Sequence, residues 1–188
     1  MTPRRLRSLS AAVAIAGVVL LSQGGWIYLK AHLAQGLLHR AWKKTLAGER
    51  EVKPWPWADT WPVARLTVPG TQVDAIVLAG ASGRTLAFGP GHLDGTSPPG
   101  GAGNCVLSAH RDTQFGFLRS LLPGQQIRVQ GREGTTTIYR VTGARVVDRG
   151  STADLEPTSE RTLTLVTCYP FDAVAPGGRL RYVVRARG

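Results

Sequence analysis

Cysteine is scarce in this sequence, and acidic residues are far fewer than basic ones. The chain of 188 residues has two cysteines, four histidines, 12 acidic residues and 23 basic residues, with a formal net charge of +11. No group of cysteines and histidines has the spacing of a zinc site, and no acidic loop has the pattern of a calcium hand. The sequence therefore predicts neither a metal nor any other cofactor.

The sequence also lacks an internal repeat and a basic run with interleaved aromatic residues. Its arginines are spread along the chain, which argues against nucleic acid as the partner of this positive charge. A hydrophobic content of 43% supplies a packed core and excludes a disordered chain. The length fits one domain of ordinary size, and 23 glycines and 12 prolines favour a β-rich fold with many turns.

A stretch without charged residues lies near the N-terminus. Residues 9–29 follow a basic tail, residues 1–8, and as a helix they would span about 31 Å, which matches a bilayer core. Trp26 and Tyr28 suit the interface at the end of such a span. A cleaved signal peptide is the alternative, but no small-x-small cleavage site follows the run. We expect an uncleaved transmembrane anchor, whose orientation the flanking basic residues do not fix.

Residues 30–54 are expected to form an amphipathic helical linker. Apolar side chains share one face of its helical part, namely Leu33, Leu37, Leu38, Ala41, Trp42 and Leu46. This face either packs on the following domain or rests on lipid headgroups, and the sequence leaves both interpretations open. Prolines then rule out a regular helix or a central strand over residues 52–62. The tryptophans of this segment, Trp55, Trp57 and Trp61, are expected to wrap the domain edge.

From residue 63 onward the pattern is that of an all-β domain. Turn signals at short intervals separate eight candidate strands, as in a barrel or a sandwich. These are residues 63–68, 73–79, 105–110, 126–131, 135–143, 144–148, 162–168 and 180–186. Residues 114–122 are expected to form one helical turn, and the Gly/Pro-rich residues 89–104 are expected to form a long loop with little regular structure.

Reactive side chains stand at the ends of three of these candidate strands. Cys168 ends residues 162–168 just before a Tyr-Pro pair, His110 ends residues 105–110, and Arg179 and Arg181 stand at the start of the last strand. Together they offer a nucleophile, a proton donor and an anion stabiliser. Each residue alone has an ordinary structural explanation, so the prediction of an active site depends on the combination.

The second cysteine, Cys105, is not expected to pair with Cys168. It opens the strand that ends at His110, and five residues of strand span roughly 16 Å. That separation is too long for a disulfide if Cys168 lies beside His110. The sequence therefore predicts two free cysteines.

The motifs around these residues resemble the sortases, a family of membrane-anchored cysteine transpeptidases. The resemblance is carried by "TLVTC" (residues 164–168) with an arginine downstream, and by "GNCVLSAHRDTQFGFL" (residues 103–118) upstream. The order His, Cys, Arg also agrees. The segments "PWPWADTWPVARL" and "TCYPFDAVAPGG" look most like the class from Gram-negative bacteria. One departure is Ala109, where many relatives have glycine, and it does not touch the catalytic atoms.

The resemblance implies a closed eight-stranded β-barrel over residues 55–188, preceded by the transmembrane helix. It also implies that Cys168 attacks the carbonyl after threonine in a protein substrate with a Leu-Pro-x-Thr-Gly sorting signal. The resulting thioacyl-enzyme is resolved by an amine acceptor, with water as a slow competitor. The implied location is the inner (cytoplasmic) membrane, as a single-pass protein with its catalytic domain on the periplasmic or extracytoplasmic side.

In this mechanism His110 protonates the departing amine and Arg181 stabilises the oxyanion. Arg181 is favoured over Arg179 because "YVV" follows it directly, as in the family, although two residues so spaced face the same way in a strand. His92, in the long loop, is the other candidate imidazole, and it ends no predicted strand.

Two other functions use the same residues. An anchored cysteine peptidase would hydrolyse the thioacyl-enzyme, and its product would be a free acid with or without an added amine. A non-catalytic, membrane-tethered β-barrel that only binds a partner would have an unreactive Cys168.

Overall fold

The computed structural model describes residues 3–175 and 177–188, and it omits the side chains of residues 3–12, 14, 27 and 28. The chain forms two units, Met1–Gly36 and Leu37–Gly188. Helix α1 (Pro3–Leu46) supplies the first unit and the beginning of the second.

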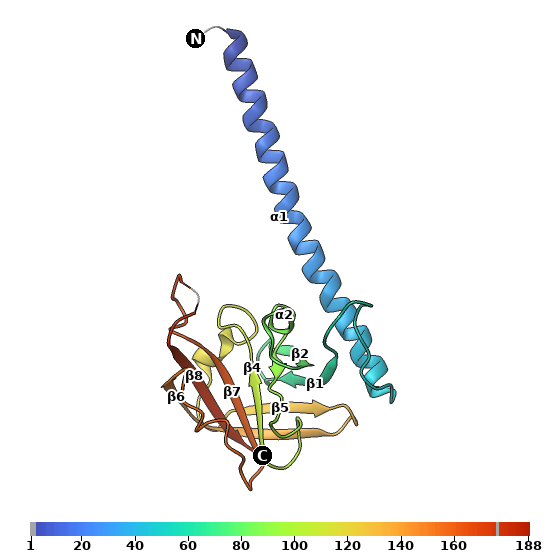
Figure 1. Cartoon of the computed structure of the whole chain (residues 1–188), viewed down its shortest axis with the longest axis vertical. Coiled ribbons are helices and arrows are strands. Elements are labelled where there is room, and N and C mark those ends of the chain that lie inside the picture. Colours follow the sequence, from blue (N-terminus) through green and yellow to red (C-terminus); the bar gives the residue numbers. More distant parts are fainter. Residues whose placement is uncertain (1–2, 176) are drawn as a thin grey trace. The chain divides into compact units, whose positions relative to one another are not determined.

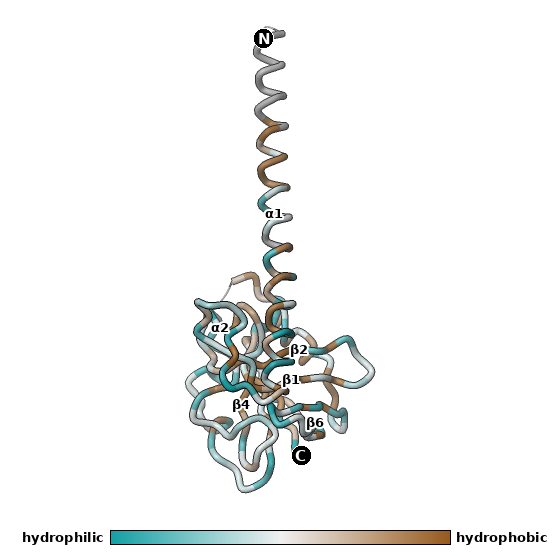
Figure 2. The backbone as a smooth tube through the Cα atoms, turned by 90° about the vertical axis from the view of Figure 1, so that its right-hand side faces the viewer, coloured by the Kyte–Doolittle hydropathy of each residue, from teal (hydrophilic) through white to brown (hydrophobic). Residues whose placement is uncertain are grey.

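The first unit contains the predicted membrane span. Figure 2 shows brown, hydrophobic turns of α1 interrupted by hydrophilic teal ones. Among the described residues, no helix is long and apolar enough to cross a bilayer. The side chains of the predicted basic tail, residues 1–8, and of the first part of the predicted span, residues 9–29, lie outside the described residues. The transmembrane anchor therefore stays a prediction.

The last turns of α1, from residue 37 to residue 46, pack on the outside of the β domain. Leu38 and Trp42 are 0% and 3% exposed and form one buried cluster with Ile76 and Leu78. Part of the predicted apolar face, Leu38, Ala41 and Trp42, thus packs on the domain, whereas Leu33 and Leu46 are 61% and 39% exposed. Burial against protein satisfies the same hydrophobic pattern that a membrane surface would.

The tryptophan-rich segment that follows contributes one of its rings to this packing. Trp55 meets Phe88 with ring centroids 4.7 Å apart. Trp57 is 83% exposed, so it takes no part in the predicted aromatic wrapping of the domain edge.

Eight strands close into a barrel in the order β1-β2-β3-β4-β7-β8-β6-β5 (Figure 1). The predicted closed eight-stranded fold is therefore confirmed. The strands are β1 (Pro62–Thr67), β2 (Asp74–Ala79), β3 (Gly91–His92), β4 (Asn104–Ser108), β5 (Gln126–Gly131), β6 (Thr136–Asp148), β7 (Thr162–Tyr169) and β8 (Leu180–Arg187). Short helices α2 (Gly83–Leu86) and η1 (Gly116–Ser120) connect strands, and η1 lies within the predicted helical turn 114–122.

The identity of two strands differs from the prediction. The segments 135–143 and 144–148 are one strand, β6, whose register against β8 shifts between Val141 and Gly143. A bulge of this kind bends a strand without ending it, so the glycine looked like a turn in the sequence. The eighth strand is instead β3, a two-residue strand inside the expected long loop. Two residues are too few to show an alternating pattern.

Alternation along the strands separates the barrel interior from its outer surface. Leu163 and Leu165 of β7 point inward and are 0% exposed, as are Cys105 and Leu107 of β4. The even-numbered residues of β4 and β7 consequently face outward. The outer face of β4, β7, β8 and β6 is the surface on which the predicted site lies.

Candidate active site

The strand pairing places Cys168 and Arg181 in one row across the barrel wall, and His110 follows the end of the neighbouring strand. Cys168 on β7 is directly opposite Arg181 on the antiparallel neighbour β8. On its other side β7 runs parallel to β4, and Ser108 pairs with Val166. The same register continued by two residues places His110 beside Cys168. All three side chains belong to the outward-facing set, with His110 exposed and Cys168 and Arg181 half-buried.

The two threonines of "TLVTC" hold this register. The Thr167 hydroxyl donates to the backbone oxygen of Ala109 at 2.7 Å, and the Ala109 amide donates to the oxygen of Val166 at 3.3 Å. At the other end of the strand, the Thr164 hydroxyl donates to Oδ1 of Asn104 at 2.7 Å. These bonds join β4 to β7 toward both ends of their paired region. The motif therefore fixes the position of the backbone next to His110 relative to the thiol of Cys168.

The structure separates the two candidate arginines. Arg181 lies inside β8, and its Nη1 donates to the backbone oxygens of Gly178 at 2.7 Å and Leu180 at 2.9 Å. Arg179 precedes the strand, is 83% exposed, and pairs with Asp148 at 3.2 Å. Only Arg181 is the cross-strand partner of Cys168, so the geometry favours it as the cation of this row.

A buried arginine that the sequence did not single out lies next to His110. Arg111 is 8% exposed, and its Nη2 donates to the backbone oxygens of Ala173 at 2.6 Å and Ala175 at 3.1 Å. These carbonyls belong to the loop between β7 and β8, which Arg119 also contacts through the ring of Phe171 at 5.2 Å. Arg111 thus ties the loop after Cys168 to the strand end that carries His110. An arginine directly after a predicted strand end is usually solvated, so only its position within "SAHRD" could have suggested this role.

The two cysteines occupy opposite faces of the same wall. Both are free, as predicted. Cys105 is 0% exposed in the core, and burial raises the pKa of its thiol to about 12. Cys168 faces outward at the end of β7 and is half-buried. Their opposite orientation and separation along the strands keep them apart, and only Cys168 is open to a reactant.

A pocket of about 230 Å³ with an apolar floor lies beside the row of site residues. Outward-facing valines form its floor, and the loop between β6 and β7 forms one wall. Its apolar lining includes Val106, Val166, Val183, Leu93 and Leu155, and its polar lining includes Arg181, Ser108, Asp148, Arg149, Ser151 and Asp154. Val166 and Val183 are themselves cross-strand partners, one row away from Cys168 and Arg181. The pocket can take an apolar side chain of a molecule whose reacting atom is at the thiol.

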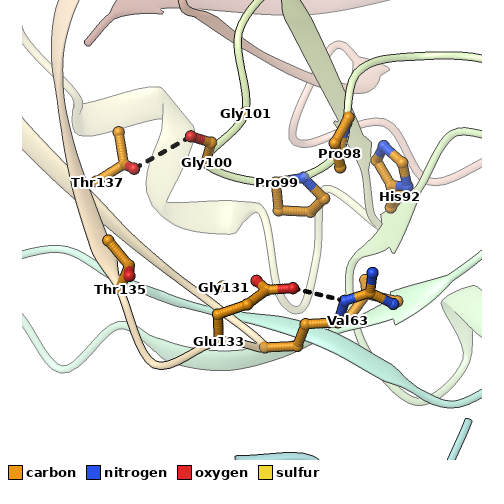
Figure 3. Close-up of a pocket in the computed structure, with 11 residues that line it drawn as sticks. Val63, His92, Pro98, Pro99, Gly100, Gly101, Gly131, Glu133, Thr135 and Thr137 are labelled. Carbon is orange, nitrogen blue, oxygen red and sulfur yellow. Dashed lines mark hydrogen bonds and ion pairs between the residues drawn. The ribbon is translucent and has the colours of Figure 1, made fainter. Parts of the chain in front are cut away.

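A larger cavity, of about 360 Å³, is lined by none of Cys168, His110 and Arg181 (Figure 3). Its lining comes from the start of β1 and β6, the end of β3 and β5, and the loop that contains Pro98 and Gly101. His92 borders this cavity, and its Nε2 is 2.9 Å from the oxygen of Ser97 and 3.1 Å from the Thr96 hydroxyl. His92 is therefore held by its own loop and borders a cavity that Cys168 does not line.

In residues 3–175 and 177–188, no group of three or more His, Cys, Asp or Glu side chains is placed to hold a metal ion.

Known proteins match both the sequence and the fold of this domain. The sortase-domain family model matches residues 66–188. Sortase D of Bacillus subtilis (strain 168) is 32% identical over 120 residues, which cover 63% of this chain and 60% of that protein. The chain thus spans less than two thirds of the length of that relative.

Solved structures of sortases have the same barrel. A Clostridium perfringens sortase D5 transpeptidase superposes with a TM-score of 0.65 at 22% identity, covering 83% of this chain and 98% of that one. Sortase C-1 of Actinomyces oris superposes with a TM-score of 0.59 at 32% identity, covering 67% of this chain and 73% of that one. These relatives carry the class names D and C, so the expected likeness to the Gram-negative class stays a prediction. The match of a family model to well over half of the sequence, together with this shared fold, shows that the chain belongs to the sortase family.

Proposed function

We propose that this protein is a cysteine transpeptidase that cleaves a Leu-Pro-x-Thr-Gly-like sorting signal after threonine and transfers the acyl group to an amine. The observation that carries this proposal is the cross-strand pair of Cys168 and Arg181, with His110 in the continued register of β4. A thiol, an imidazole and a guanidinium on one exposed row are the groups that acyl transfer requires.

The proposed reaction has two steps. The Cys168 thiolate bonds to the carbonyl carbon of threonine, the C–N bond to glycine breaks, and the leaving amine takes a proton from His110. The acceptor amine then attacks the thioester carbon, the sulfur leaves as a thiolate, and His110 takes the proton of the amine. Arg181 donates hydrogen bonds to the oxyanion in both steps, from a side chain oriented by the Gly178 and Leu180 carbonyls.

The apolar pocket beside Cys168 supports a donor signal with an apolar residue upstream of the cleaved bond. Its valine floor lies one row from the thiol, and a leucine side chain has the chemistry that such a floor accepts. We therefore assign this pocket, lined by Val106, Val166, Val183, Leu93 and Leu155, to the leucine of the signal. We call it the donor pocket below.

The decisive test is capture of the thioester. Incubation with a signal peptide should add the mass of the acyl fragment to the wild-type protein, and an added amine should remove it with formation of an amide. Cys168→Ala should abolish this adduct, while Cys105→Ala, which removes the buried thiol, should retain it. An adduct in the Cys168→Ala variant would contradict the assignment of the nucleophile.

The same experiment separates transfer from hydrolysis. A peptidase would release the free acid even with a saturating amine, because water would resolve the thioester first. A binding module would bind the peptide and form no adduct at all.

We also propose that residues 9–29 anchor the protein in the inner (cytoplasmic) membrane as a single-pass protein, with the catalytic domain on the periplasmic or extracytoplasmic side. The support is a stretch of sequence without a charged residue and with the length of a bilayer core. The full chain should remain with membranes after an alkaline carbonate wash. Protease added from outside should digest the catalytic domain once the outer membrane or cell wall has been made permeable. Release of the chain by carbonate would refute the anchor.

A further inference from the structure

We infer that the ion pair between Arg145 and Asp154 forms the side wall of the donor pocket and limits the size of the side chain that the pocket accepts. This inference rests on the proposed function. It assigns a specificity role to two residues outside the row of Cys168 and Arg181.

The register of the barrel wall places Arg145 at the edge of the pocket floor. One row of outward-facing cross-strand partners runs from Ser108 on β4 through Val166 and Val183 to Arg145 on β6. This row is adjacent to the one that contains Cys168 and Arg181. Arg145 therefore continues the floor made by Val166 and Val183, on the side where β6 closes the sheet.

Asp154 approaches Arg145 from above this floor. Its carboxylate accepts two hydrogen bonds from the Arg145 guanidinium, one of them from Nε at 3.3 Å. The Asp154 side chain is 4% exposed, whereas that of Arg145 is 52% exposed. A buried carboxylate with a two-pronged arginine partner has a restricted position, and losing the partner alone would leave a buried charge.

The backbone of Asp154 is held by β4, which β7 and β8 separate from the strand of Arg145. Asn104, at the start of β4, donates through Nδ2 to the backbone oxygens of Asp154 at 2.9 Å and Glu156 at 3.0 Å. Its own Oδ1 accepts from Thr164. The loop between β6 and β7 is thus attached both to β4 and to β6, and it crosses over β7 and β8 between these two attachments.

The ion pair separates two cavities. Asp154 lines the donor pocket, and Arg145 lines a neighbouring cavity of about 200 Å³ together with Ala144 and Arg185. Val183 lines both cavities, and the two members of the pair line one cavity each. Removal of the pair would join the two spaces, and the joined pocket would accept a larger side chain, such as an aromatic one, than the present pocket.

The experiment compares donor peptides that differ only at the leucine position, with Leu, Phe or Trp before Pro-x-Thr-Gly. We expect the double variant Arg145→Ala, Asp154→Ala to lower the Leu-to-Phe ratio of kcat/KM at least tenfold relative to wild type. Removing both partners leaves no unpaired buried charge. The matched control is Arg185→Ala, which lines the neighbouring cavity without belonging to the pair and should leave the ratio within twofold of wild type.

The outcomes separate this inference from the proposed function. A wild-type protein that forms no thioester with any peptide refutes the function. A wild-type protein that cleaves the Leu peptide, with a double variant whose ratio is unchanged, refutes the side wall. If the double variant does not fold, as shown by its thermal melt, the double variant Arg145→Ala, Asp154→Asn replaces it. It removes the guanidinium half of the wall and puts a neutral amide in place of the buried carboxylate, and an unchanged ratio in it would also overturn the inference.

Discussion

The inner and outer faces of the same barrel wall give two cysteines opposite properties. Cys105 lies on β4 and Cys168 lies on β7, and these two strands neighbour each other in the barrel. Cys105 faces the core, where it packs as a small hydrophobic side chain, and Cys168 faces outward at the end of its strand. The difference comes from strand alternation and from position along the strand, because both residues have the same chemistry.

The comparison extends to two histidines of the barrel domain. His110 follows the end of β4, two residues beyond the pair of Ser108 and Val166, whereas His92 borders a cavity that Cys168 does not line. The larger cavity is therefore not the one that the proposed function uses. The proposed site is chosen by its thiol, guanidinium and imidazole and not by cavity size.

The largest effect expected from this comparison is a difference in thiol reactivity. Iodoacetamide at neutral pH should alkylate Cys168 and leave Cys105 unmodified, because burial raises the pKa of Cys105 to about 12 and shields its sulfur. At pH 7 a thiol with such a pKa is a thiolate in only about one molecule in 10⁵. Mass spectrometry of the digested protein measures both sites. Equal labelling in the folded protein would contradict the comparison, and equal labelling in denaturant is the control.

The two arginines next to the thiol offer a sharper test of the outer face. Arg181→Ala should reduce kcat/KM for the donor peptide by about 10²–10³, the cost of losing one oxyanion donor. Arg179→Ala removes only an exposed ion pair with Asp148, so its kcat/KM should stay within twofold of wild type. A larger loss in the Arg179 variant would reverse the assignment.

A substitution on the inner face of the barrel should change the stability of the protein and leave its turnover unchanged. Cys105→Ser places a hydroxyl in the core where the thiol is 0% exposed, and it should lower the free energy of unfolding by about 1–3 kcal/mol. Denaturant melts measure this loss. Thioester formation per folded molecule should not change, since the core side chain does not reach the outer face. A loss of turnover without a loss of stability would show that the two faces are coupled.

A surface ion pair gives the smallest expected effect, and it varies with pH. Arg65 hydrogen-bonds Asp74 and lowers the pKa of that carboxyl. Because the pKa of Asp74 is lower in the folded protein than in the unfolded chain, the ionised carboxyl stabilises the fold at pH values above the usual pKa of a carboxyl. This stabilisation is lost as the pH falls through the pKa of the folded state. Both side chains are 40% exposed, so Asp74→Asn should cost at most about 1 kcal/mol near pH 7 and nothing in strong acid. Denaturant melts of wild type and variant, near pH 7 and in strong acid, measure this cost at each pH. An equal cost at both pH values would contradict the prediction.

Much of the barrel could be predicted from local patterns, and the failures have local causes. Strand β7 alternates and stops at a Tyr-Pro pair, so its extent could be predicted to within one residue, and so could the position of Cys168 near its end. Strand β3 is too short to alternate, and Gly143 marks a bulge in β6 where a turn was expected. Arg111 could not be assigned, because its acceptors are carbonyls of a loop more than sixty residues later in the chain.

The sequence alone determined which side chains are available for chemistry and the strand ends that carry them. Hydrophobic alternation and turn residues act over a few neighbouring positions, so strands and their ends can be predicted from the sequence alone. The tertiary structure decided that Arg181 and not Arg179 is the cross-strand partner of Cys168, the face to which each cysteine turns, and the pairing of Arg145 with Asp154. These depend on the register between strands distant in sequence, and only closure of the barrel fixes that register.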